Sequence, residues 1–67
     1  MPLPAEMLDN IKRSIDEAEA TIKSIEDVIS DLRVGGIDAT AQEEALRNAK
    51  NQLAQLRVFY GRQIKRT

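Results

Sequence analysis

Carboxylates are the most abundant groups in this sequence that could carry out chemistry. They occur in three clusters, which are Asp16, Glu17 and Glu19; Glu26, Asp27 and Asp31; and Glu43 and Glu44. Paired carboxylates can act as acid and base, or hold two metal ions inside a helical bundle. A di-metal centre of the ferritin-like kind also needs Glu-x-x-His motifs, and the chain has no His. We therefore interpret the clusters as solvated helix surface, and predict no metal site and no cofactor.

The other residue types that could carry out chemistry also lack the neighbouring residues that catalysis or phosphate binding requires. There is no Cys, and the hydroxyls of Ser14, Thr21, Ser24, Ser30 and Thr40 have no imidazole to activate them. The pair Gly35-Gly36 lacks the surrounding spacing of a phosphate-binding loop. The sequence predicts no catalytic residues and a protein that is not an enzyme.

Apolar residues in the first half follow a strict alternation of three and four positions. They are Leu8, Ile11, Ile15, Ala18, Ile22, Ile25, Ile29 and Leu32. This is the heptad repeat of a helix that packs along a narrow seam against a partner helix, with Leu8 at position a and Ile11 at position d. Pro4 suits a first helical turn and Glu6 suits the positive end of the helix dipole. We expect a helix over about residues 4–33.

A second helix with the same spacing follows a short break. Gly35 or Gly36 can adopt the left-handed conformation that ends a helix. Thr40 and Glu43 have the spacing of a capping box, and Asp38 is the alternative cap. The second seam comprises Leu46, Ala49, Leu53, Leu56 and Tyr60, with Gln42 and Gln63 as outer members. We expect a turn over about 34–39 and a helix over about 40–65, which makes residues 1–67 one all-α domain, an antiparallel coiled-coil-like hairpin.

Charges on one side of the predicted hairpin are complementary. We call the e positions of both helices the charged flank. It consists of Lys12, Glu19, Glu26, Arg33, Glu43, Lys50 and Arg57, followed by Ile64. In an antiparallel pair, e positions face e positions. The facing pairs are then Arg33–Glu43, Glu26–Lys50 and Glu19–Arg57, which fix the register of the two helices.

The g positions on the opposite side carry almost no charge. We call them the uncharged flank; it consists of Met7, Ser14, Thr21, Val28, Ala45, Gln52 and Phe59, and only Arg66 beyond it is charged. Depletion of charge is typical of the core of a protein interface. A single core of fewer than about 70–80 residues rarely supplies more than 3–5 kcal/mol. We therefore expect the uncharged flank to be an association surface, which turns two hairpins into a dimeric four-helix bundle.

Along this flank we expect Val28 near Ala45, Thr21 near Gln52, and Ser14 near Phe59. Phe59 is its one large aromatic residue, and aromatic residues often anchor interfaces. The alternative is that Phe59 covers the open end of its own hairpin, beside Ile11, Ile15 and Ile64. A helical protein other than a second copy is the main rival partner, and the sequence leaves the relative direction of two hairpins open.

A basic C-terminal region offers a second functional hypothesis. Residues 47–67 hold six bases and no acid, and Arg57, Arg62, Lys65 and Arg66 are candidates for contacting phosphates of nucleic acid. The simpler interpretation is that cations suit the C-terminus of a helix. The two hypotheses differ in salt dependence, because phosphate contacts weaken steeply as salt rises.

The overall charge and hydropathy limit which functional classes remain for this protein. The net charge of −1 gives no global attraction to nucleic acid or anionic membranes. No uncharged stretch approaches the ~20 residues of a membrane span, and the N-terminus lacks the features of a signal peptide. We expect a soluble cytoplasmic protein that acts as a non-enzymatic interaction or regulatory module. Nucleic-acid binding by a hairpin dimer is the alternative.

Overall fold

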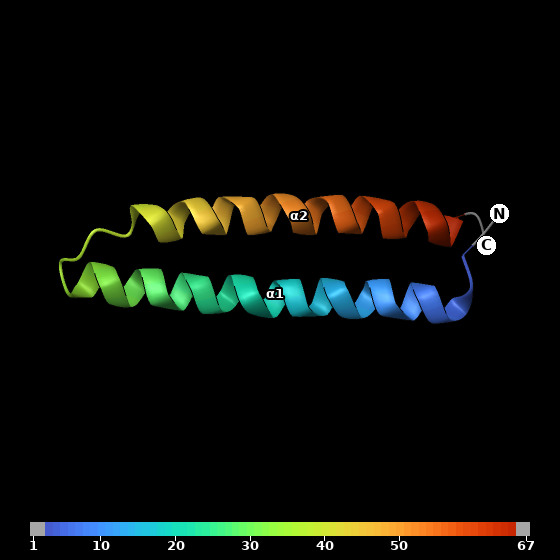
Figure 1. The fold of residues 1–67 in the computed structure, drawn as a ribbon, viewed down its shortest axis with the longest axis horizontal. Coiled ribbons are helices and arrows are strands. Elements are labelled where there is room, and N and C mark those ends of the chain that lie inside the picture. The colour runs from blue at the N-terminus through green and yellow to red at the C-terminus, as the bar shows by residue number, and fades with distance from the viewer. Residues whose placement is uncertain (1–2, 66–67) are drawn as a thin grey trace.

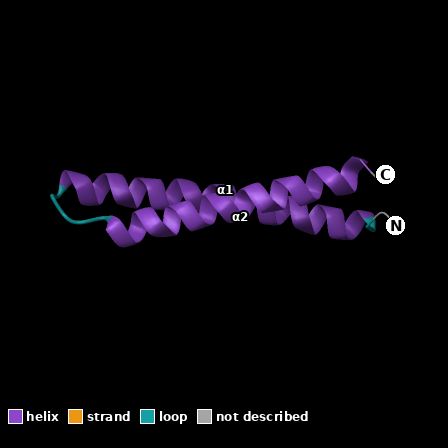
Figure 2. Cartoon of the chain, turned by 90° about the horizontal axis from the view of Figure 1, so that it is seen from above, coloured by secondary structure: helices purple, strands orange, loops and turns teal. Residues whose placement is uncertain are grey.

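Two antiparallel helices make up the fold. The computed structural model describes residues 3–65, in which α1 spans Ala5–Val34 and α2 spans Thr40–Lys65. The helices lie side by side, with both chain ends at one end of the hairpin and the turn at the other (Figure 1). Seen after a 90° rotation, they cross at a shallow angle near their middles (Figure 2). The predicted all-α antiparallel hairpin is confirmed, and the helix bounds differ from the expected ones by one residue at most.

The core of the hairpin is the predicted heptad seam. Every predicted seam residue is buried or half-buried, whereas every charged residue between 3 and 65 is exposed. Ile15, Ile22 and Leu53 form the centre of the core, and the seam residues around them pack against it. The core is thin, because two helices can cover only one side of each other. The molecule measures 51 × 15 × 12 Å.

A backbone motif that requires glycine ends α1. The amide of Ile37 donates to the Leu32 carbonyl at 2.8 Å, and that of Gly36 donates to the Arg33 carbonyl at 3.1 Å. This is the bonding pattern of a Schellman motif, in which the residue after the helix cap is left-handed. Gly36 is that residue, with φ of +71°, while Gly35 has φ of −81°. Of the two predicted candidates, Gly36 therefore fulfils the left-handed role.

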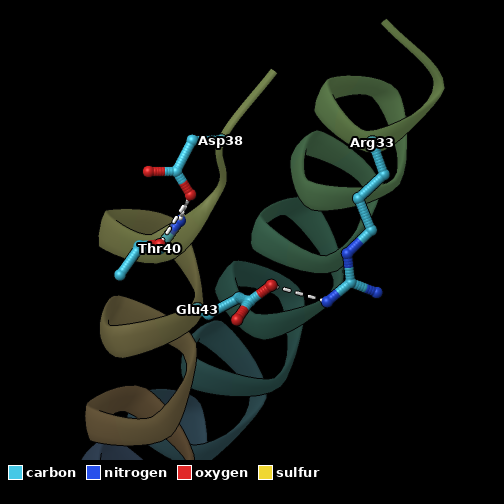
Figure 3. Close-up of polar contacts among 4 residues, drawn as sticks. All are labelled: Arg33, Asp38, Thr40 and Glu43. Atoms are coloured by element: carbon cyan, nitrogen blue, oxygen red, sulfur yellow. Dashed lines mark hydrogen bonds and ion pairs between the residues drawn. The ribbon is translucent and has the colours of Figure 1, made fainter. Parts of the chain in front are cut away.

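Asp38 organises the start of α2. One of its carboxylate oxygens accepts hydrogen bonds from the Thr40 hydroxyl at 2.6 Å and from the Thr40 amide at 3.1 Å (Figure 3). These two bonds hold the pKa of the Asp38 carboxyl below its ordinary value, the hydroxyl bond being the larger cause. The Thr40 amide donates to Asp38, the Glu43 amide donates to the Ala39 carbonyl, and the Glu43 carboxylate binds Arg33. The capping box proposed for Thr40 and Glu43 therefore does not form, and the competing Asp38 takes over.

Three ion pairs connect the helices along the charged flank. They join Arg33 to Glu43 at 2.6 Å, Arg57 to Glu19 at 2.9 Å and Lys50 to Glu26 at 3.9 Å. Figure 3 shows the first of them spanning the hairpin next to the turn. All three are the pairs predicted from the sequence, so the register is confirmed. Their side chains are about half exposed, so each contributes little free energy and mainly fixes the alignment.

Candidate interaction surface

Ion pairs cross the hairpin on the charged flank, whereas the uncharged flank carries exposed residues beside a half-buried apolar row. On α1, the a residues Ile15, Ile22 and Ile29 are buried, while the a residue Leu8 near the start of the helix is half-buried. The d residues on the same helix are all only half-buried, and these are Ile11, Ala18, Ile25 and Leu32. Position d lies next to position g around a helix, as position a lies next to e. The half-exposed row therefore borders the uncharged flank, and α1 is rotated so that its apolar stripe extends beyond α2.

Residues of the uncharged flank itself are exposed along both helices. Met7, Val28 and Phe59 expose 50%, 47% and 44% of their surface. Ser14, Thr21, Ala45 and Gln52 are exposed as well. With the half-buried d residues beside them, they form a continuous surface of apolar and uncharged polar side chains. Such a surface costs little to desolvate, because it contains no ionised group.

A hollow at the turn end brings residues of both helices together on this surface. Its volume is about 370 Å³, and Thr21, Ile25 and Val28 of α1 face Gln42 and Ala45 of α2 across it. Val28 and Ala45 thus line the same hollow. Ala20 and Ser24 complete the lining.

Phe59 lies in the other half of the surface, where it lines two hollows. It lines one hollow of about 340 Å³ with Gln52, Gln55 and Leu56. A neighbouring hollow of about 360 Å³ adds Ala54, Val58 and Arg62. All these residues belong to α2. The two hollows that Phe59 lines are therefore formed by α2.

On the opposite side, the corresponding hollow has charged residues in its lining. It is lined by Glu26, Ile29, Ser30, Arg33, Val34, Glu43 and Leu46, and the Arg33–Glu43 ion pair spans it. A second helix docking there would have to displace or desolvate these charges, which is costly. The two sides of the hairpin therefore differ sharply in their suitability for association.

The candidate nucleic-acid contacts are spread over different environments. Arg57 is engaged with Glu19 across the hairpin, while Arg62 lies beside Val58 and Phe59. Lys65 is exposed at the last turn of α2, and Arg66 is outside the described residues. Arg57 is thus already neutralised by a carboxylate, which leaves Arg62 and Lys65 as the described members of this set.

Some exposed apolar residues were not among the predicted site residues. Val34 and Ile37 flank the turn with 87% and 59% exposure, and Val58 adjoins Phe59 with 56%. Val58 occupies an f position. The sequence feature that could have pointed to it is that it directly precedes Phe59. Among residues 3–65, no group of three or more acidic side chains is placed to hold a metal ion. Neither described helix has an apolar stretch that could cross a membrane.

Comparisons of the chain with protein-family models, with curated proteins and with solved structures gave no significant match.

Proposed function

We propose that the protein is a non-enzymatic interaction module whose uncharged flank packs against another helical surface. The observation that carries this proposal is the row of half-buried d residues on α1, which borders the exposed uncharged flank. A helical stripe that is left half covered in one hairpin is completed when further helices pack beside it. The charged flank already has its internal partners, so the uncharged flank is the side that can be covered without breaking ion pairs.

The exposed area supports the same proposal. The hairpin exposes 5215 Å², whereas a compact monomer of 7.5 kDa would expose roughly 4,200 Å². The excess of about 1,000 Å² is close to the ~800 Å² that each partner buries in a stable interface of standard size. One helical partner along the flank is therefore enough to remove the excess. A second copy of this chain is the simplest such partner.

Sedimentation of matched variants tests the proposal. We expect the wild-type chain to be a dimer at micromolar concentration and Val28→Glu to be a monomer, because each copy would bring a carboxylate into the desolvated surface. Thr21→Glu should act in the same way. Glu26→Gln is the matched control on the charged flank, and it should leave the dimer nearly intact.

Two results would refute this assignment. A stable, folded wild-type monomer would mean that the flank needs no partner. A Val28→Glu chain that stays dimeric while Glu26→Gln dissociates would mean that the roles of the two flanks are reversed. A partner of another kind would instead give a poorly stable isolated chain that becomes ordered when that partner is added.

A further inference from the structure

Two hairpins can associate through the uncharged flank in two directions. With the two-fold axis along the helices, both turns lie at the same end and α1 of each copy lies beside α2 of the other. With the axis perpendicular to the helices, the turns lie at opposite ends, and each helix lies beside its own counterpart. Neighbouring helices are antiparallel in both arrangements, so helix direction alone does not decide between them.

We propose, as an inference that rests on the proposed function, that the uncharged flank binds a second copy of this chain. The turns of both copies lie at the same end of the dimer, so that α1 of each copy packs against α2 of the other.

The charge of each helix favours this arrangement. Over its described range, α1 carries eight acids and four bases, a net charge of −4. The range of α2 carries two acids and five bases, a net charge of +3. In the same-end bundle every helix has only oppositely charged neighbours. In the opposite-end bundle, each new contact places two acidic or two basic helices side by side, which is unfavourable over the length of the contact.

The outer edge of the uncharged flank shows the same difference in charge between α1 and α2 at individual positions. This edge consists of the c positions, which lie one helical turn from flank residues on the side away from the seam. On α1 it comprises Asn10, Glu17, Ser24 and Asp31, and on α2 it comprises Ala41, Asn48, Gln55 and Arg62. The edge of α1 therefore holds two acids and no base, whereas that of α2 holds one base and no acid.

The register places Glu17 and Arg62 within reach of each other between copies. In each of the three observed ion pairs the two residue numbers add up to 76, so Glu17 is level with Phe59. Arg62 lies three residues further along, about 4.5 Å at the rise of an α-helix. A two-fold axis along the helices leaves these levels unchanged, so Glu17 of one copy faces Arg62 of the second copy. Both side chains are exposed in the single hairpin.

The hollow at the turn end fits a second copy in the same direction. Val28 and Ala45 line it together, and in the same-end arrangement the hollows of both copies lie at one level. Val28 of each copy then meets the space beside the small Ala45 of the other. In the opposite-end arrangement, the two hollows lie at opposite ends, and Val28 instead lies level with the stretch between Met7 and Ser14 of the second copy.

Charge reversal at Glu17 distinguishes the same-end dimer from the opposite-end dimer, because it weakens the first and tightens the second. In the same-end dimer, Glu17→Lys faces Arg62 and weakens dimerisation about two- to tenfold, as expected for two exposed ion pairs. Arg62→Glu should do the same, and the double variant should regain affinity. In the opposite-end dimer, Glu17→Lys would enter an acidic border and tighten the dimer. Asp16→Lys is the matched control, because it makes the same charge change at a b position away from the flank.

Distances between spin labels provide the second readout. The chain has no Cys, so one introduced Cys reports only distances between copies. For Val34→Cys, at the exposed end of α1, the same-end dimer gives roughly 15–30 Å from helix spacing, while the opposite-end dimer gives more than about 40 Å from helix rise. Lys23→Cys lies near the middle of α1 and gives a short distance in both arrangements.

The outcomes separate this inference from the function on which it rests. Short distances at both sites, together with weakening by Glu17→Lys, support the same-end dimer. A short distance at position 23 with a long one at position 34 overturns the inference but leaves the interaction surface in place. A monomer by sedimentation, with no distance at either site, overturns both the second copy as the occupant and self-association.

Discussion

Truncation of two neighbouring seam residues measures whether the uncharged flank is covered in solution. Ile22 is an a residue at the centre of the core, 8% exposed, whereas Ile25 is a half-buried d residue that lines the hollow at the turn end. Replacing a buried Ile with Ala removes about three methylene equivalents, or about 2.4 kcal/mol at ~0.8 kcal/mol each. The cavity left behind raises the cost to roughly 2–5 kcal/mol.

In an isolated hairpin the two substitutions have different costs. The exposed part of Ile25 has less packing to lose, so Ile25→Ala would reduce the free energy of unfolding by clearly less than Ile22→Ala. In a dimer closed through the uncharged flank, Ile25 lies at the centre of the bundle. We then expect both variants to fall in the range of about 2–5 kcal/mol.

Urea denaturation followed by circular dichroism, at low and at high protein concentration, gives the comparison. Glu26→Ala is the control, because its ion pair is 3.9 Å long and half exposed and should contribute well under ~1 kcal/mol. If Ile25→Ala costs less than half of Ile22→Ala even at high concentration, the flank is not covered. If Glu26→Ala costs as much as either, the assignment of the seam is wrong.

Two further predictions concern the turn. Gly36→Ala should destabilise the hairpin by about 1–2 kcal/mol, because φ of +71° is strained for a residue with a Cβ atom. Gly35→Ala should cost much less, since its φ is −81° and an added Cβ would lie 3.6 Å from its nearest neighbours; equal losses of melting temperature would contradict this reading. Asp38→Ala should lower the melting temperature at neutral pH by removing the carboxylate that binds Thr40. Because the pKa of Asp38 is lowered in the folded state from 3.8, the difference from wild type should persist down to about that pH and shrink below it. A difference that is the same at all pH values, or that grows in acid, would show that the carboxylate acts in another way.

The fold was predictable because several independent signals in the sequence agree. The alternation of three and four residues from Leu8 to Leu32 fixes both the helix and the face that it buries. The three charged pairs then fix direction and register, and all three are observed. The length of the connection contributes as well, since two helices joined by a turn of about five residues must be antiparallel neighbours.

Local motifs were less reliable where a tertiary contact competes for the same side chain. Thr40 and Glu43 have the spacing of a capping box, but Arg33 reaches Glu43 from the other helix. A guanidinium gives the carboxylate a charge-assisted hydrogen bond, which is stronger than the bond to a backbone amide that the box would supply. Asp38 then binds Thr40 in its place. This outcome depends on how close two helix ends lie, which sequence spacing alone does not give.

The composition of the uncharged flank was predictable from the sequence, but the extent of the apolar surface beside it was not. Heptad positions identify which residues lie beside the seam, and so they identify the uncharged flank from Met7 to Phe59. They do not give the rotation of each helix about its own axis, which sets how the a and d rows share burial. In the hairpin, α1 is rotated so that Ile22 is buried while Ile25 remains half exposed. The opening therefore includes the d row as well as the flank, and a second pair of helices would bury both rows together. The face left uncovered by the fold is thus wider and more apolar than its flank residues alone, which is the physical reason for assigning association to that side.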